Sequence, residues 1–375
     1  MDEQRSGKED SVEQLLSNLR QHNWSVNWKT ADALAEMGQS AVPQLLRALE
    51  DPDGYVRNGA AIALGKIGNS DATQALIKAL QWRDDGVYED DEDQEARMSA
   101  ATALGKLHTA AACQVLMAEL EKRASTDLTL ASYIVEALGE IGNPETIPLI
   151  KRAITSEDFE LQKIGSWALA QLGTEGIEAL LQIAANHDQT ARPYVIRALG
   201  TNTVRSATPL LLQILKDPNE DKFVRCQAAQ ALGNIGGSPE ILPLLLAMLQ
   251  APEEPVRTGA LWGLGALHDS RAYSAIVQQL DGGHHRYTAI MALGELGDPR
   301  ACGLLTPMLK SGDYSLTFHA ATALGKLGCC HALPELIQLR DRMAVSDSPV
   351  SEAHRATVEA VIQTLRQREH GSVSP

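Results

Sequence analysis

Aromatic residues are scarce in this chain of 375 residues: 5 Trp, 7 Tyr and 3 Phe make up 4% of the sequence. Hydrophobic residues as a whole still amount to 44%, which is enough for a substantial core. Such a core must be built from aliphatic side chains, and a fold organised around large rings is excluded. Because so few rings are available, the positions that they occupy are informative.

Basic residues, long apolar runs and a cysteine pattern are lacking too. With 33 Lys and Arg against 48 Asp and Glu, the net charge is −15, which excludes nucleic acid as a partner and fits a basic or mixed protein surface better. No run approaches the roughly 18 apolar residues of a membrane-spanning helix, and Met1–Arg5 lacks an apolar signal core. Five cysteines without framework spacing fit a reducing compartment. We therefore expect a cytoplasmic protein without membrane insertion.

What the chain has in abundance is a Leu-Gly step that returns at a nearly fixed spacing. It occurs at Leu64-Gly65, Leu104-Gly105, Leu138-Gly139, Leu199-Gly200, Leu232-Gly233, Leu264-Gly265, Leu293-Gly294 and Leu324-Gly325. In Leu34-Ala35 and Leu169-Ala170 an alanine replaces the glycine. The intervals from Ala35 onward are 30, 40, 34, 31, 30, 33, 32, 29 and 31 residues. A period near thirty predicts a stack of repeated units.

Each Leu-Gly step lies on a predicted helix with a small-residue face. Counted from the glycine, Ala or Gly fills positions −5 and −2 in most copies, Leu fills −1, and Ile or Leu usually fills +2, all on one side of an α-helix. Glycine at +3, as in Gly68 and Gly142, suits a left-handed residue that ends the helix. A second helix follows, with proline near its start as at Pro43 and Pro148. No pair buries its apolar face alone, so the sequence predicts an all-α solenoid of about ten stacked helix pairs.

The stretch Val56–Gly68, together with the helix Ala41–Leu49, resembles the HEAT-like repeat of the phycobilin-lyase type, and the resemblance covers residues 11–340. It implies a right-handed superhelix with the Leu-Gly helices along its concave wall. Similar repeats occur in phycobilin lyases and their chaperone-like relatives, in deoxyhypusine hydroxylase and in binding scaffolds. Deoxyhypusine hydroxylase-like proteins hold iron with His-Glu dipeptides, and this sequence contains none, so that activity is disfavoured.

Four segments stand outside the predicted repeats. Residues 1–10 are predicted to be a disordered N-terminal tip and residues 370–375 a tail. Residues 83–95 are an acidic insertion whose carboxylates should repel one another and keep it a solvated loop, with a basic partner or a weak Ca²⁺ contact as the alternative. Residues 341–369 are predicted to form a loop and a helix that caps the solenoid.

Enzyme signatures are absent: there is no Cys-x-x-Cys, His-Glu-x-x-His, phosphate-binding loop or Gly-x-Ser-x-Gly. Soft metal ligands gather in the last third, at His268, His284, His285, Cys302, His319, Cys329, Cys330 and His331. His268 and Cys329 fall in equivalent turns two repeats apart, roughly 16–20 Å, which is too far for one metal site. We expect no metal, and we interpret Cys329–His331 as a turn with buried thiols rather than as a metal-binding or reactive site.

The candidate site lies on the face of the Leu-Gly helices that the packing residues leave free. Positions −7, −6 and −3 hold seven of the 15 aromatic residues: Trp28, Tyr133, Trp167, Tyr194, Trp262, Tyr287 and Phe318. Arg197 and His319 share this face. Exposed Trp and Tyr side chains on one surface are typical of a binding groove. The alternative is that these rings pack against the next repeat, as apolar stripes at helical spacing commonly do.

Arginine recurs at position −8, as Arg57, Arg97, Arg192, Arg225, Arg257 and Arg286. Such a ladder could bind anions. We favour a structural role, in which the guanidinium groups bridge to turn carboxylates such as Asp51, Asp53 or Asp217.

Two functions fit these observations. The first is a non-catalytic scaffold that holds a protein partner in an aromatic-lined concave groove and has no resident cofactor. The second, implied by the resemblance, is a phycobilin lyase or lyase-like chaperone whose groove holds a transient bilin, an open-chain tetrapyrrole, and a phycobiliprotein subunit. An enzyme of this kind would be a bilin lyase or isomerase, with a Tyr or His moving protons. The sequence identifies no catalytic residue.

Overall fold

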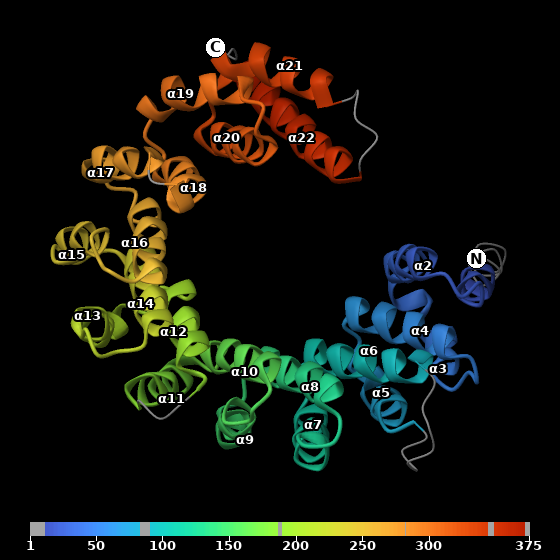
Figure 1. Cartoon of the computed structure of the whole chain (residues 1–375). Helices are drawn as coiled ribbons and strands as arrows, with labels where there is room; N and C mark the ends of the chain where they lie inside the picture. Colours follow the sequence, from blue (N-terminus) through green and yellow to red (C-terminus); the bar gives the residue numbers. More distant parts are fainter. Residues whose placement is uncertain (1–11, 83–90, 187–189, 282, 344–348, 372–375) are drawn as a thin grey trace. The chain divides into compact units, whose positions relative to one another are not determined.

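The computed structural model describes residues 12–82, 91–186, 190–281, 283–343 and 349–371. Its regular elements are α-helices and short 3-10 turns, and no strand occurs in these ranges. The chain divides into two compact units, Met1–Ala198 and Leu199–Pro375, called here the N-terminal and C-terminal units. Each unit is a series of helix pairs (Figure 1), and the predicted all-α solenoid is confirmed. The predicted N-terminal tip, residues 1–10, lies outside the described residues.

The Leu-Gly helices form one row in each unit. In the N-terminal unit, after a helix over residues 12–19, this row consists of α2 (Trp24–Glu36), α4 (Gly54–Ile67), α6 (Asp91–Leu107), α8 (Leu128–Ile141) and α10 (Phe159–Gln171). Helix α12 (Arg192–Thr201) runs across the division. In the C-terminal unit the row consists of α14 (Lys222–Ile235), α16 (Glu254–Ala266), α18 (Arg286–Leu296) and α20 (Tyr314–Leu327).

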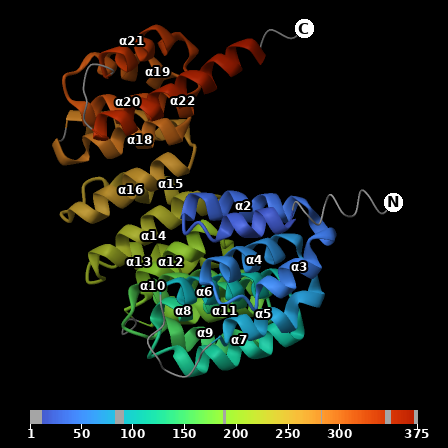
Figure 2. The same cartoon turned by 90° about the vertical axis from the view of Figure 1, so that its right-hand side faces the viewer.

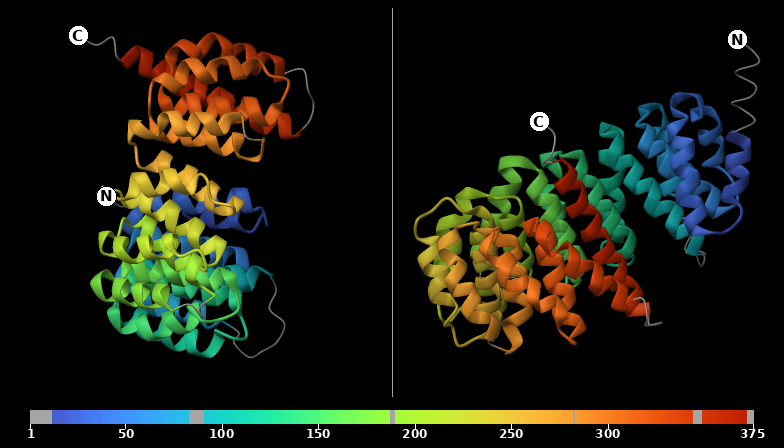
Figure 3. Two further views of the ribbon diagram at one scale, coloured as in Figure 1. Left: turned by 60° about the vertical axis from the view of Figure 1, so that its left-hand side comes forward. Right: turned by 90° about the horizontal axis from the view of Figure 1, so that it is seen from above.

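The second helices of the pairs form the other row. In the N-terminal unit they are α3 (Val42–Ala48), α5 (Thr73–Leu80), α7 (Ala110–Arg123), α9 (Ile147–Ile154) and α11 (Gly173–Ala185). In the C-terminal unit they are α13 (Thr208–Lys216), α15 (Ile241–Met248), α17 (Tyr273–Gln278), α19 (Arg300–Leu305) and α21 (Leu333–Met343). Successive Leu-Gly helices contact one another far more extensively than successive second-row helices do. Within each unit the helix pairs therefore stack as layers (Figures 2 and 3), and the second-row helices lie farther apart than the Leu-Gly helices do (Figure 1).

The Leu-Gly row is tight because its helices meet through glycine and alanine. A side-chain carbon added at Gly65 on α4 would lie 2.9 Å from the Cα of Ala103 on α6. The same contact recurs one repeat later, where a carbon at Gly105 would lie 2.9 Å from the Cα of Ala137 on α8. The glycine of one repeat thus faces the −2 alanine of the next, which confirms the small-residue face predicted from the sequence.

Aspartates and glycines define the ends of the Leu-Gly helices. Asp127 precedes α8 and its side chain accepts a hydrogen bond from the Leu130 N–H at 3.0 Å, while Asp158 does the same for α10 with the Leu161 N–H at 2.8 Å. Each carboxylate satisfies a backbone donor that has no partner within the first turn and stabilises the positive end of the helix. At the other end of α8, Gly142 has φ of 75°, the left-handed conformation expected at position +3.

The arginine ladder is structural, as favoured from the sequence, but its main partners are backbone carbonyls. Arg97 Nε donates to the Leu80 carbonyl at 2.9 Å, and Arg192 Nε donates to the Ala184 carbonyl at 2.9 Å. Both carbonyls lie at the C-terminal end of the preceding second-row helix, where a cation is favourable. Arg97 is 1% exposed and Arg192 3% exposed, so neither guanidinium is open to an external anion.

The acidic segment 83–95 differs from its prediction in the part that the structure describes. Residues 83–90 lie outside the described residues, but residues 91–95 form the first turn of α6 rather than a loop. Asp93 is 7% exposed and forms an ion pair with Arg57, which is 1% exposed. The prediction of a uniformly solvated loop is wrong here, because Arg57 of the preceding repeat neutralises the Asp93 carboxylate. Repulsion among the acidic side chains alone would have kept Asp93 in solvent.

Cys302 and Cys329 form a disulfide, with their Cα atoms 5.8 Å apart. Residues 329–331 do lie in a turn in which Cys329 is buried, but the prediction of a thiol at Cys329 is wrong, because its sulfur is bonded to Cys302. The cytoplasmic location stays a prediction. Repeat geometry explains the pairing, because the turn after a Leu-Gly helix meets the second-row helix of the preceding pair. Asn143 and Cys113 meet in the same way, with Asn143 Nδ2 3.5 Å from Cys113 Sγ.

Thiol titration of the unfolded chain should detect this bond directly. Of the five cysteines, Cys113, Cys226 and Cys330 are free. In guanidinium without reductant we expect Ellman's reagent to titrate three thiols per chain, and after reduction it should titrate five. Five thiols in the unreduced sample would show that Cys302 and Cys329 are not bonded.

The C-terminal end of the stack is covered by α22 (Pro349–Gly371), which packs against α20 and α21. Val358, Ile362 and Leu365 are fully buried, so this helix closes the last Leu-Gly helix as a cap. Residues 344–348 of the predicted loop and 372–375 of the predicted tail lie outside the described residues. Among the described helices, none combines the length and the apolar character needed to span a bilayer.

Candidate functional site

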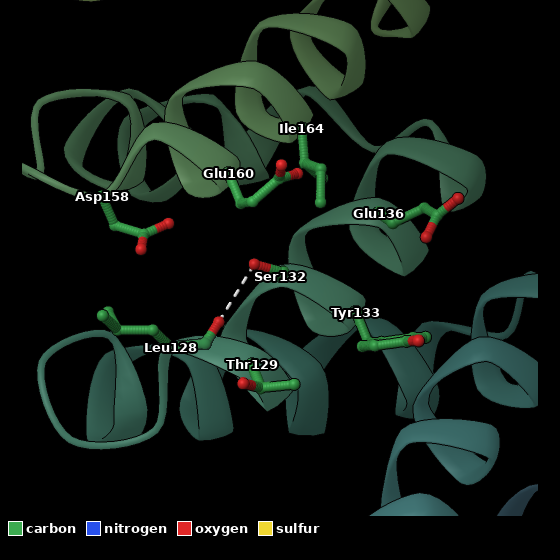
Figure 4. Close-up of a pocket in the computed structure, with 8 residues that line it drawn as sticks. All are labelled: Leu128, Thr129, Ser132, Tyr133, Glu136, Asp158, Glu160 and Ile164. Atoms are coloured by element: carbon green, nitrogen blue, oxygen red, sulfur yellow. Dashed lines mark hydrogen bonds between the residues drawn. The ribbon is translucent and has the colours of Figure 1, made fainter.

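Three pockets adjoin one another on the Leu-Gly row of the N-terminal unit, and together we call them the N-terminal groove. The first, of about 390 Å³, lies between α8 and α10 and is lined by Leu128, Thr129, Ser132, Tyr133, Glu136, Asp158, Glu160 and Ile164 (Figure 4). The second, of about 220 Å³, reaches from α2 to α8 and includes Trp28, Lys66, Glu95, Lys106, Tyr133 and Glu136. The third, of about 320 Å³, is lined by Glu136, Lys163, Ile164, Trp167, Ala168 and Gln171. Glu136 lines all three.

The rings predicted for this part of the chain are open to solvent. Trp28 is 54% exposed, Tyr133 38% and Trp167 45%, which are large fractions for aromatic side chains. Lys66 Nζ lies 5.3 Å from the centre of the Trp28 ring and also pairs with Asp32. The structure therefore brings three of the predicted site residues to the walls of connected pockets instead of burying them between repeats.

Some polar groups in and beside the first pocket already have a hydrogen bond or ion pair within the described part of the chain, and others have none there. Ser132 Oγ donates to the Leu128 carbonyl at 3.0 Å, and Lys163 Nζ pairs with Glu160 at 2.8 Å. Figure 4 shows Tyr133 and Glu136 on α8, across the pocket from Glu160. Of these groups, Tyr133 and Glu136 remain available to a ligand.

Charge and burial act together on the groups around Tyr133. Burial raises the pKa of the Tyr133 hydroxyl, and the nearby carboxylates of Glu95 and Glu136 raise it further. Burial also raises the pKa of the Glu95 carboxyl, with a smaller contribution from Asp91. The centre of the groove is therefore a negatively charged environment around a phenol that stays protonated at neutral pH.

The two remaining predicted residues of the N-terminal unit lie on α12. Tyr194 is half-buried and Arg197 is exposed. In the C-terminal unit, Trp262 on α16 is half-buried. That these three side chains bind a partner stays a prediction.

The other predicted rings of the C-terminal unit contact one another. The Tyr287 and His319 rings stack with centroids 5.1 Å apart, and Phe318 stacks on His354 of α22 at 4.4 Å. Tyr287 Oη donates to Asp313 Oδ2 at 2.9 Å, and this bond is the main reason that the pKa of Tyr287 is raised. Tyr287, Phe318 and His319 are half-buried. They are not withdrawn from solvent, but their ring contacts agree in part with the alternative that the predicted rings pack against the next repeat.

A second set of exposed apolar side chains was not predicted. These lie at the first turn of Leu-Gly helices: Leu128 (40% exposed), Phe159 (60%), Phe223 (56%) and Tyr314 (55%). The sequence signal is a capping aspartate followed within two residues by a large apolar residue, as in Asp127-Leu128. Leu128 links this set to the groove, because it lines the first pocket.

One group of potential metal ligands lies within the described residues: His22, Asp53 and Glu92, whose ligand atoms all lie within 4.8 Å of one another. Arg20 Nη1 is 3.8 Å from the same Asp53 oxygen that faces His22, so a cation already compensates this carboxylate. The soft ligands of the last third form no such group in the described residues, and the side chain of His284 lies outside them.

Comparison with known proteins matches the chain to HEAT repeats over residues 12–90, 117–200, 177–265, 208–286 and 273–361. The phycocyanobilin lyase subunit alpha of Microchaete diplosiphon is 35% identical over 208 residues, 51% of this chain and 70% of that protein. The bilin biosynthesis protein PecE of Mastigocladus laminosus is 31% identical over 152 residues, 40% of this chain and 55% of that protein. The deoxyhypusine hydroxylase of Candida albicans is 28% identical over 237 residues, 60% of this chain and 68% of that protein.

Proposed function

Because this chain belongs to the HEAT-repeat family and is a relative of the phycobilin lyases, we propose that it is a scaffold that holds a protein partner in the N-terminal groove. Trp28, Tyr133 and Trp167 act as anchors that pack against apolar side chains of the partner. The observation that carries this proposal is the coincidence of three adjoining pockets with three exposed rings on one helix row.

The charges of the groove favour a protein over a bilin. Lys66 and Lys163 are already paired, with Asp32 and Glu160. The charged groups that act on Tyr133 are the carboxylates of Glu95 and Glu136, which would repel the two propionates of an open-chain tetrapyrrole. Bilin handling is the second candidate function, since two relatives are named for bilin biosynthesis or as a bilin lyase. In that case the protein partner would be a phycobiliprotein subunit. The absence of His-Glu dipeptides continues to disfavour hydroxylase activity despite the third relative.

Site-specific photocrosslinking in the native cell tests the scaffold proposal. With p-benzoylphenylalanine in place of Tyr133, irradiation should attach one protein that mass spectrometry identifies. The same photoreactive residue in place of Glu178, an exposed residue of the second-row helix α11, is the matched control and should attach none of it. Equal products at both positions, or no product at Tyr133, would overturn the scaffold function.

A spectral titration separates the second candidate. Phycocyanobilin added to the purified chain should show no shifted or intensified visible band, because the carboxylates of Glu95 and Glu136 at the centre of the groove repel its propionates. Trp167→Ala is the companion variant. A strong band with the original chain that disappears in Trp167→Ala would instead replace the scaffold by bilin handling as the function of this groove.

A further inference from the structure

We propose that the centre of the N-terminal groove receives an arginine side chain of the protein partner, between the carboxylates of Glu95 and Glu136 and against the ring of Tyr133. This inference rests on the proposed function and names the chemistry by which the groove selects its partner.

Glu136 occupies the central position in the groove. It projects from α8 and lines all three pockets, while Tyr133, nearly one turn earlier on the same helix, lines two of them. Glu95 reaches the second pocket from α6. Both carboxylates raise the pKa of the Tyr133 hydroxyl, so they act on the same small volume. An occupant of this volume meets two carboxylates and one aromatic ring.

The two carboxylates have no internal cation. Neither Glu95 nor Glu136 forms an ion pair with another described residue. Lys106 also lines the second pocket, but it forms no ion pair with either carboxylate. Negative charge at the centre of the groove is therefore left for a partner to neutralise.

A guanidinium group suits this environment better than other side chains do. It is planar, it forms paired hydrogen bonds to carboxylates, and it stacks on the face of an aromatic ring such as that of Tyr133. An anionic group would be repelled by both carboxylates, and a neutral apolar group would leave them desolvated without a partner. Trp28 and Trp167, in the outer pockets, would then contact the apolar side chains that flank the arginine.

An array of random heptapeptides, probed with the fluorescently labelled full-length chain, tests this inference. Arginine should be at least threefold enriched among bound peptides. In solution, replacing that arginine by citrulline, which has the same shape without the charge, should weaken binding of the best peptide at least tenfold by fluorescence anisotropy.

Variants of the chain locate the effect. In Glu95→Gln/Glu136→Gln the arginine and citrulline peptides should bind within about twofold of each other, while Glu140→Gln, one turn beyond Glu136 on α8, should keep the tenfold preference. Trp167→Ala should weaken both peptides alike. Equal binding of the two peptides by the original chain, or no binding to the array, overturns the arginine site. The scaffold function stands or falls separately on the Tyr133 crosslink.

Discussion

Replacing Arg57 with methionine should lower the free energy of unfolding by about 3–5 kcal/mol, the cost typical of removing one partner from a buried ion pair. Arg57 is 1% exposed, and its partner Asp93 on α6 is 7% exposed. In the variant the Asp93 carboxylate would stay buried without this cation. The Asp51 carbonyl would lose a hydrogen bond of 2.6 Å, and the Trp82 ring would lose a guanidinium that lies 4.4 Å from its centre.

Urea denaturation followed by circular dichroism measures this loss, with Arg152→Met as the matched control. The Arg152 side chain is 70% exposed and lies 4.0 Å from Glu121, so its loss should change the stability by less than about 0.5 kcal/mol. The double variant Arg57→Met/Asp93→Leu should recover part of the loss, because no buried charge remains. A loss below about 1 kcal/mol in Arg57→Met, or no recovery in the double variant, would contradict the ion pair's role.

The contact between Arg57 and Asp93 also marks the limit of what the sequence could predict. The helix pairs and the glycine–alanine seam follow from periodicity, because every repeat shows the same residues at the same positions. Asp93 follows a long acidic stretch that belongs to no repeat, and its partner lies 36 residues earlier. The prediction therefore rested on repulsion among the carboxylates of this stretch. The structure of residues 91–95 depends instead on one buried cation, Arg57. The disulfide between Cys302 and Cys329 was missed for the same reason, as a pairing between neighbouring repeats.

The candidate site was predictable as a surface but not as a set of pockets. Positions −7, −6 and −3 correctly placed Trp28, Tyr133 and Trp167 on an exposed helix face. The same positions in the C-terminal unit place Phe318 against His354, because α22 supplies a ring that the repeat pattern does not contain. The exposure of Phe159 could not be read from periodicity, since it depends on whether a neighbouring helix covers the first turn of α10.

The seam between α14 and α16 provides the second large effect. A side-chain carbon at Gly233 would lie 2.2 Å from the carbonyl oxygen of Gly263 and 2.4 Å from its Cα. Both atoms belong to the backbone and cannot rotate away, so Gly233→Ala must push the two helices apart. Such overpacking costs about 1–3 kcal/mol or more, against a gain of about 1 kcal/mol from the higher helix propensity of alanine. Because the clash is with backbone atoms, we expect the overpacking cost to lie at the upper end of this range, and the net loss to be about 2 kcal/mol.

Gly303→Ala is the matched control, because it makes the same chemical change in a helix without the collision. Gly303 lies in α19, is exposed, and an added carbon there meets nothing within 4 Å. Only the helix-propensity term remains, so this variant should gain up to about 1 kcal/mol. Parallel urea titrations should give changes of opposite sign. If both variants were stabilised, the close approach of α14 to α16 would be wrong, since a seam with room for a methyl group has no need of glycine at position 233.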